Sequence, residues 1–267
     1  MSHSFSVVKC SFWPERQRLL PGHSPVSVIY AETEKLDYRM LRRFISADEL
    51  ERSSKFRLIS DRCTYVCCHA ILRLVLARRL NEKPCNLIFA KGIHNKPYLP
   101  GDPVFFNISH TRKAFAIAIS DAYVGIDLED MSRLIDVKLI MKSSFSISER
   151  LFITKDKTKE MESLILLWTR KEAFLKAIGK GITTDLGEIN VSEINNLISR
   201  KIIPEGEDSI ISGENSIFSI RLSDHYLSVA TPKDEYPELT VIDENNYIQI
   251  VSDLLNSEYK PEGAVFL

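Results

Sequence analysis

Hydrophobic and polar positions recur along the chain at two spacings, and each spacing predicts a different kind of element. Apolar residues three or four positions apart, with arginines on the remaining face, predict a long helix over residues 61–80. The same spacing predicts helices at 38–45, 47–56, 134–142, 146–154, 159–178 and 246–256. Runs rich in β-branched residues predict strands at 26–31, 87–90, 104–108, 114–120, 123–128, 188–191, 217–222, 226–230 and 238–241.

These elements follow a repeated order, in which helices are succeeded by antiparallel strands. The order predicts an α+β fold made of two similar subdomains with pseudo-twofold symmetry, over residues 26–129 and 130–267. Three prolines and a glycine interrupt residues 1–25, which we expect to form an irregular N-terminal extension. Residues 201–215 are rich in Gly, Glu and Ser and predict a mobile surface loop.

Composition narrows the class of protein. The 267 residues carry a net charge of −1, so no global basic field indicates a nucleic-acid partner, and an anionic ligand must be held by a local cluster. The five cysteines fit no metal-ligand spacing. The N-terminal residues do not resemble a signal peptide, and no apolar run approaches the ~18 residues of a membrane span. We therefore expect a reduced, cytoplasmic protein without a membrane partner.

The first candidate for chemistry is the acidic pair Asp127 and Glu129. Residues two apart on a strand point to the same face, so the two carboxylates lie side by side while Ile126 and Leu128 face the core. Two interpretations are open. The pair is either a solvated strand edge or a hard oxygen site suited to magnesium and to phosphate groups.

A second candidate lies on the predicted helix 159–178. Trp168, Glu172 and Lys176 share one helical face through i,i+4 spacing. Glu172 and Lys176 alone would indicate a surface ion pair worth a few tenths of a kcal/mol. Their position beside a tryptophan and apolar residues favours instead a third carboxylate and an ammonium group at a metal and phosphate site. Gly179 and Gly181 follow as helix-ending residues.

Two short polar segments, Ser109-His110 and Lys96-Pro97, complete the set of candidates. Ser109 and His110 end an apolar strand, but adjacent strand residues point apart and no nucleophile elbow is present, so they fit phosphate binding better than a hydrolase dyad. Lys96 precedes Pro97, which favours an extended backbone. Each step alone is weak evidence.

Taken together, these segments resemble the 4′-phosphopantetheinyl transferase family, of the larger monomeric type that activates peptide and polyketide synthetases. The resemblance rests on Lys96-Pro97, Phe106-Asn-Ile-Ser-His110, Gly125-Ile-Asp-Leu-Glu129 and Trp168-x-x-Lys-Glu-Ala-x-x-Lys176-x-x-Gly-x-Gly181. It covers roughly residues 45 to 185. The resemblance implies a monomer that binds coenzyme A in the cleft between its two subdomains.

The resemblance also implies a role for each matching residue. Asp127, Glu129 and Glu172 would bind Mg²⁺ with the pyrophosphate of coenzyme A, which Lys176 would also contact. The remaining coenzyme A contacts would be Arg52, Arg62, Lys96, Ser109 and His110. This chain departs from some family members, because Glu49 and Thr64 stand where those carry basic residues. Lys55 and Arg57 are therefore alternative contacts for the 3′-phosphate.

The implied reaction moves the 4′-phosphopantetheine arm of coenzyme A onto a serine of an apo acyl or peptidyl carrier protein. Glu172 is the expected base, directly or through a metal-bound water, and Glu149 is the competitor; Lys176 would neutralise phosphate charge. Residues 134–152, basic and apolar, would contact the carrier or simply pack. Two other functions stay open: a metal-dependent coenzyme A or nucleotide pyrophosphate hydrolase, and a nucleotide-binding pseudoenzyme.

Overall fold

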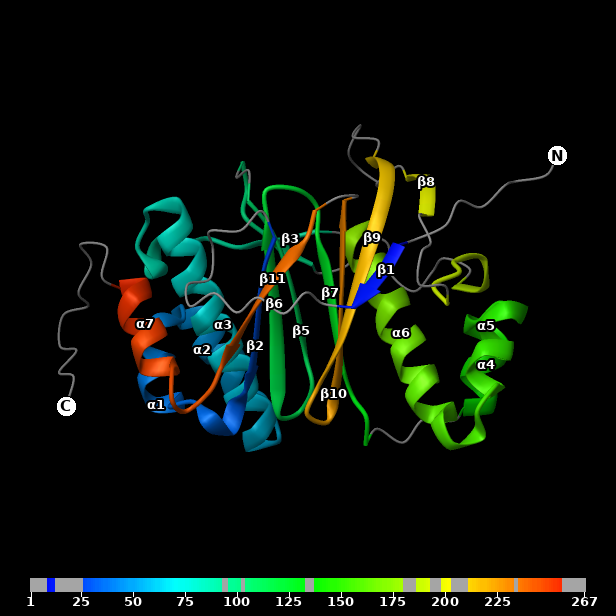
Figure 1. The fold of residues 1–267 in the computed structure, drawn as a ribbon. Helices are drawn as coiled ribbons and strands as arrows, with labels where there is room; N and C mark the ends of the chain where they lie inside the picture. The colour runs from blue at the N-terminus through cyan, green and yellow to red at the C-terminus, as the bar shows by residue number, and fades with distance from the viewer. Residues whose placement is uncertain are drawn as a thin grey trace.

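The computed structural model describes residues 9–12, 26–92, 96–101, 104–132, 137–179, 186–192, 198–202, 211–232 and 235–255. Two β-sheets lie next to each other in the middle of the molecule, and helices cover their outer sides (Figure 1). The mixed helices and sheets confirm the predicted α+β class, whereas the pseudo-twofold relation stays a prediction. Among the described residues no helix is long and apolar enough to cross a membrane.

The first sheet has the strand order β11-β2-β6-β5. Its strands are β2 (Val26–Glu32), β5 (Phe105–His110), β6 (Ala114–Ser120) and β11 (Pro237–Ile242). β6 pairs antiparallel with β2 and β5, while β11 runs parallel to β2. Every residue of β6 is buried, which explains its unbroken apolar run.

Helices cover the outer face of this sheet. They are α1 (Tyr38–Leu41), α2 (Ala47–Ser54), α3 (Ile59–Leu80) and α7 (Tyr247–Leu255). A capping box between Ser46 and Glu49 starts α2. α3 supplies much of the core under the sheet, including Ile71, Leu72 and Leu76. A small two-stranded sheet, β3 (Ala90–Lys91) and β4 (Pro97–Tyr98), follows α3.

The second sheet has the order β1-β9-β10-β7, with β8 paired to β9. Its strands are β1 (Lys9–Phe12), β7 (Gly125–Asp130), β8 (Ile198–Ile202), β9 (Ile211–Leu222) and β10 (His225–Pro232). The helices of this side are α4 (Val137–Ser144), α5 (Ile147–Thr154) and α6 (Glu160–Ala177). α6 packs against β7 and β10 and carries the second sequence candidate.

Two polar side chains join the sheets where their edge strands β5 and β7 meet. The backbone N–H of Ile126 donates to Asn107 Oδ1 over 2.9 Å, and the N–H of Leu128 donates to Ser109 Oγ over 3.2 Å. β10 pairs with β7 on one side only, so these two N–H groups on the other side of β7 find their acceptors in the side chains of Asn107 and Ser109. Asn107 and Ser109 therefore connect the two halves of the molecule.

Several predicted elements were wrong in detail. The strand expected at 87–90 is reduced to Ala90–Lys91, because Arg73 takes the carbonyl groups of Pro84 and Leu87. The strand expected at 188–191 is absent from that described stretch, where Leu186–Glu188 forms a 3₁₀ turn. The loop expected at 201–215 contains the ends of the paired strands β8 and β9; residues 203–210 lie outside the described part.

The predicted division at residue 130 does not account for two elements. β11 pairs with β2, and α7 packs on α3, so residues 237–255 complete the core of the first half. β1, within the extension expected to be irregular, pairs with β9. Long-range strand pairing, which local patterns do not encode, decides both placements. The start of the helix predicted at 134–142 and the predicted cap Gly181 lie outside the described residues.

Candidate active site

The candidate site begins where β7 lies unusually close to α6. A Cβ placed on Gly125 would come within 2.0 Å of the Ala173 carbonyl oxygen and 2.2 Å of the Ala177 backbone nitrogen. Only glycine permits this approach. Farther along the same pair, Trp168 Nε1 donates to Glu129 Oε1 over 3.1 Å. The glycine in the first motif therefore brings that motif against the second.

At the centre of this contact lies the Asp127 carboxylate, buried on β7. Its Oδ1 accepts from Lys176 Nζ at 2.6 Å and from Ser109 Oγ at 3.0 Å. Lys176 Nζ also donates to Ser109 Oγ over 3.1 Å. Three residues from three sequence candidates thus meet at one point between the two sheets, and their role at a phosphate and metal site stays a prediction.

The fit to a divalent cation is mixed. Nowhere in the described ranges do three His, Cys, Asp or Glu side chains converge closely enough to hold a metal ion. Lys176 and Trp168 instead satisfy one oxygen each of Asp127 and Glu129. However, Asp127 Oδ2 is buried and accepts no hydrogen bond within the described part of the chain. That oxygen, together with the carboxylates of Glu129 and Glu172, is the hard donor set that Mg²⁺ prefers.

Cationic side chains approach the same point from the first half. Lys96 Nζ donates to the backbone carbonyls of Lys176, at 2.6 Å, and Val124, at 3.4 Å. Burial, assisted by the charge of Lys176, lowers the pKa of Lys96 to about 8. Partial burial, again with a contribution from Lys176, lowers the pKa of His110 although part of its ring faces solvent. Cationic groups that are taken out of water close to another cation are stabilised by an anion placed among them.

A cavity of about 720 Å³ opens next to His110 in the first half. Aromatic and imidazole rings form one wall: Tyr65 lies 4.1 Å from His69 and 5.3 Å from Phe56, between ring centroids. Arg52 lies over the Tyr65 ring at 5.7 Å. The rest of the lining comes from Ser46, Asp48, Glu49, Leu72, Arg73, Cys85, Leu87, Ile88, Phe89, Ala90, Lys91, Pro97, Ile108 and His110.

Glu49 lies in the wall of this cavity. It accepts hydrogen bonds from His69 Nδ1 at 3.0 Å and from Arg73 Nε at 2.7 Å. Burial alone would raise the pKa of Glu49, but these two hydrogen bonds outweigh it and hold the pKa at about 2. Glu49 stands where some family members carry a basic residue. Its negative charge is nevertheless compensated in the cavity wall, because Arg73 and His69 bind its carboxylate.

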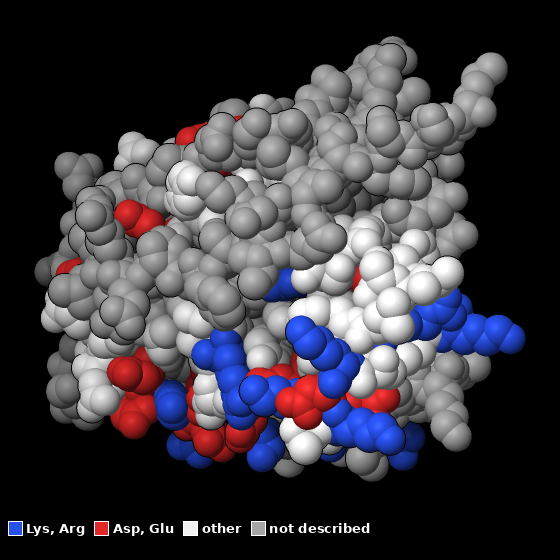
Figure 2. Space-filling model, turned by 45° about the vertical axis from the view of Figure 1, so that its right-hand side comes forward, with Lys and Arg blue, Asp and Glu red and all other residues white. Residues whose placement is uncertain are grey.

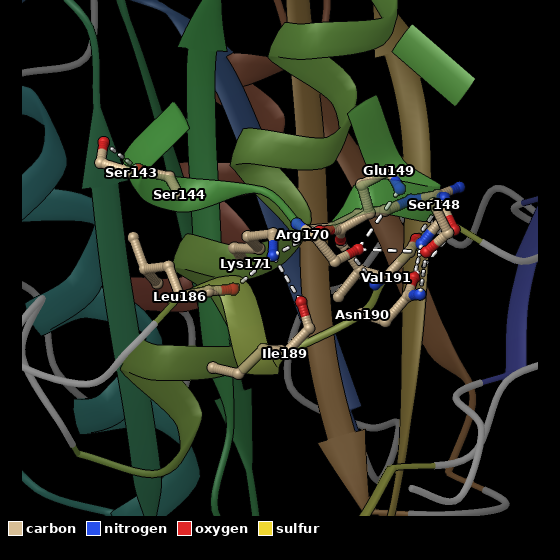
Figure 3. A network of polar contacts seen from close by, with 12 residues as sticks. Ser143, Ser144, Ser148, Glu149, Arg170, Lys171, Leu186, Ile189, Asn190 and Val191 are labelled. Atoms are coloured by element: carbon tan, nitrogen blue, oxygen red, sulfur yellow. Dashed lines mark hydrogen bonds and ion pairs between the residues drawn. The ribbon is translucent and has the colours of Figure 1, made fainter. Parts of the chain in front are cut away.

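Two sequence candidates lie elsewhere. Arg62 donates to the Ser54 carbonyl at 3.3 Å and does not line the cavity. Glu149 is fully buried between α5 and α6, where its carboxylate pairs with Lys171 at 2.8 Å (Figure 3). The alternatives Lys55 and Arg57 do not line the cavity either, and Lys55 pairs with Glu51.

Sequence reasoning missed Tyr65, His69 and Arg73 as a connected group. They follow one another at i,i+4 on α3, so they form a row of polar groups along one side of the helix. That row was a readable signal. Lys91 gave no such signal, because a strand of two residues becomes recognisable only when its neighbours are placed.

Fold and site together define an α+β protein whose carboxylates and ammonium groups suit phosphate chemistry. Residues 123–230 match the family model described as the 4′-phosphopantetheinyl transferase superfamily. A 31% identical relative is the 4′-phosphopantetheinyl transferase gsp of Aneurinibacillus migulanus, aligned over 57% of this chain and 63% of that protein. HetI of Nostoc sp. is 30% identical (55% and 65% covered), and Sfp of Bacillus subtilis is 29% identical (55% and 66%).

The matching region thus spans a little less than two thirds of each of these three relatives. The family match covers residues 123–230, and the relatives align with 55–57% of this chain, so the chain is similar to 4′-phosphopantetheinyl transferases over that region.

Proposed function

We propose that this chain transfers the 4′-phosphopantetheine arm of coenzyme A to a serine of an apo acyl or peptidyl carrier protein. The products are the holo carrier and adenosine 3′,5′-bisphosphate. The observation that supports this most directly is the meeting of Asp127, Ser109 and Lys176 between the two sheets, beside His110 and its cavity. The three relatives named above carry this transferase activity in their names.

In this proposal the pyrophosphate of coenzyme A lies near Lys176, Lys96 and His110. The depressed pKa values of Lys96 and His110 support this, because an anion among the three groups would restore favourable charge. Mg²⁺ would be held by Asp127, Glu129 and Glu172, and when bound it supplies positive charge against the phosphate oxygens. Ser109 would then act chiefly by orienting Asp127 and Lys176.

The cavity would receive the adenosine end. Its ring-lined wall at Tyr65 and Phe56 suits a flat base, and Arg52 and Lys91 lie in the lining as cations for the 3′-phosphate. Arg62, predicted as a further contact, is not part of this proposal because it does not line the cavity.

The chemical step forms a bond between the carrier serine oxygen and the phosphorus that bears pantetheine. It breaks the bond between that phosphorus and the bridging oxygen, which leaves with adenosine 3′,5′-bisphosphate. Glu172 would accept the serine proton, since it lies on α6 one turn before Lys176. Lys176 would neutralise charge on the phosphate oxygens as the leaving group departs. Glu149 is not proposed as the base, because its buried carboxylate is engaged by Lys171 and backbone groups.

The carrier would dock on α5. Ile147 and Leu151, one turn apart, are 72% and 67% exposed, and Phe152 lies beside them. Figure 2, in which the side carrying α4, α5 and α6 comes forward, shows an uncharged area with Lys and Arg side chains at its edges and Asp and Glu side chains among those below it. An acidic carrier helix would suit such a surface. The cytoplasmic location and the monomeric state expected from the sequence remain predictions.

Intact-protein mass spectrometry tests the function. An apo carrier incubated with the chain, coenzyme A and Mg²⁺ should gain one phosphopantetheine, but not with EDTA and not when its serine is alanine. Consumption of coenzyme A without any carrier would favour the pyrophosphate hydrolase instead. Binding of coenzyme A without consumption, across several carriers, would favour the pseudoenzyme.

The docking surface is tested separately. Leu151→Glu should raise the KM for the carrier at least about tenfold, because it places a charge in an apolar contact and repels an acidic partner. The KM for coenzyme A should stay unchanged. An unaltered KM for the carrier would show that it docks elsewhere.

A further inference from the structure

A fully buried ion pair connects α5 with α6, and the proposed chemistry does not use it. Glu149 and Lys171 are both 0% exposed, and Lys171 Nζ lies 2.8 Å from Glu149 Oε2. Figure 3 shows the two side chains pointing toward each other within a larger polar network. Buried charges are costly to desolvate, so a pair of this kind needs further hydrogen bonds to be tolerated.

Backbone groups of residues 186–191 supply those hydrogen bonds. Lys171 Nζ donates to the carbonyls of Leu186, at 2.6 Å, and Ile189, while the Val191 N–H donates to Glu149 Oε1 at 2.9 Å. The neighbouring Arg170 donates to the Val191 carbonyl at 3.0 Å. This segment is therefore fixed to both helices, and α5 and α6 are held in one relative position.

Each helix presents a functional face on the other side of this connection. On α5, Glu149 points inward while Ile147 and Leu151 are exposed. On α6, Lys171 directly precedes Glu172, and Lys176 follows one turn later against Asp127. The ion pair thus lies between the proposed carrier surface and the proposed catalytic groups.

We propose that Glu149 and Lys171 are positioning residues that hold α5 in register with α6, and so set where the carrier serine meets Glu172 and Lys176. The inference rests on the proposed function for its catalytic part. It assigns Glu149 a role other than that of a base. Both of its oxygens are engaged, Oε1 by Val191 and Oε2 by Lys171 and the Ser146 N–H.

The test compares Glu149→Gln, Lys171→Met and the double variant. Glu149→Gln keeps an amide oxygen as an acceptor for a neighbouring N–H group, and Lys171→Met keeps a long side chain against Phe145, which the lysine now faces at 5.2 Å. Removing one partner strands a buried charge, whereas replacing both is far better tolerated. The double variant therefore remains informative where a single variant fails to fold.

For each single variant that folds, we expect kcat/KM for the carrier to fall at least about tenfold, with partial recovery in the double variant. The Kd for adenosine 3′,5′-bisphosphate, which needs no carrier, should stay within about twofold of wild type. Assays are run where thermal melts show each protein folded. Glu162→Gln and Arg221→Met, which break an exposed ion pair between α6 and β9, serve as matched controls with little effect.

Three outcomes would overturn the proposal. A folded single variant with wild-type kcat/KM would make the pair merely structural. A double variant no better than Glu149→Gln would restore Glu149 as a candidate base. A Kd that weakens in parallel with kcat/KM would indicate general damage to the nucleotide site.

Hydrogen exchange separates this proposal from the proposed function. This measurement needs no carrier modification. Amides in α5 and in residues 170–177 should exchange faster in each folded single variant than in wild type, and the rates in the double variant should be closer to those of wild type. Unchanged exchange in the single variants would overturn the positioning role independently of any activity.

Discussion

At the scale of single residues, the environment of each carboxylate decides what it does. Asp127 and Glu149 are both buried acids paired with a lysine of α6. Both carboxylate oxygens of Glu149 interact with Lys171 or with backbone N–H groups. Asp127, by contrast, has a buried Oδ2 that accepts no hydrogen bond within the described ranges. The same kind of group is therefore structural in one place and suited to a ligand in the other.

Replacing Asp127 by asparagine tests this difference. Asp127→Asn keeps the size of the side chain but removes its charge, so we expect transfer to fall by about 100-fold or more while the fold is retained. The measurement is the rate of carrier modification, with circular dichroism as the check on folding. Asp121→Asn, which removes an exposed partner of Arg79, should behave like wild type. Full activity of Asp127→Asn in the presence of Mg²⁺ would exclude a role for this carboxylate in metal binding.

The environment of Glu49 predicts how the free energy of unfolding changes at acidic pH. Its pKa is about 2 in the folded chain, below its ordinary value of 4.5, so the folded state favours the ionised form. The resulting stabilisation, at most about 3 kcal/mol, is complete above the unfolded value and is lost as the pH falls from 4.5 toward 2. Urea unfolding of wild type and Glu49→Gln should therefore differ most near neutral pH and converge in acid. Glu51→Gln, on the same helix but exposed, should show no comparable convergence. A pH-independent difference for Glu49→Gln would contradict the assigned pKa.

At the scale of elements, the site depends on how closely β7 approaches α6. Gly125 has no side chain, and the backbone of Ala173 and Ala177 occupies the space where one would lie. This approach brings Asp127 of β7 within 2.6 Å of Lys176 on α6. A motif glycine thus acts through packing and not through a turn.

Gly125→Ala should accordingly separate the strand from the helix. Because the clashing atoms are backbone, they cannot rotate away, and we expect a loss of about 3 kcal/mol in the free energy of unfolding together with a loss of transfer activity. Gly92→Ala is the matched control, since among the described residues its added Cβ would meet only the Lys96 carbonyl oxygen, at an ordinary contact distance of 3.6 Å. Chemical unfolding measures both. Equal stability of the two variants would mean that β7 and α6 adjust freely.

At the scale of the whole molecule, the chain returns to its first half before it ends. β11 adds a parallel strand beside β2, and α7 covers α3, where Ile250 and Leu254 enter the core. The first half is therefore not a continuous segment of sequence. The first sheet needs residues 237–255 to complete its edge and its hydrophobic cover.

A chain that ends at residue 232 should expose this dependence. Loss of β11 and α7 uncovers the apolar surface of β2 and α3, so we expect loss of cooperative thermal unfolding and rapid proteolysis of the first half. Limited proteolysis with mass spectrometry would locate the cleavage sites. A truncated chain that melts cooperatively near the wild-type temperature would show that the first half is stable without its C-terminal elements.

The sequence by itself determined the α+β class, most helices and strands, and the residues that meet at the site: Ser109, Asp127, Glu129, Trp168 and Lys176. These were readable because periodicity and i,i+4 spacing are local, and because the motifs match a known family. Tertiary structure alone decided that β11 pairs with β2, that Glu149 forms a buried ion pair with Lys171, and that Glu49 lies in the wall of the cavity. Those features depend on contacts between residues far apart in the chain, where burial and hydrogen-bond partners set the role of a charged group, and local patterns carry no record of such partners.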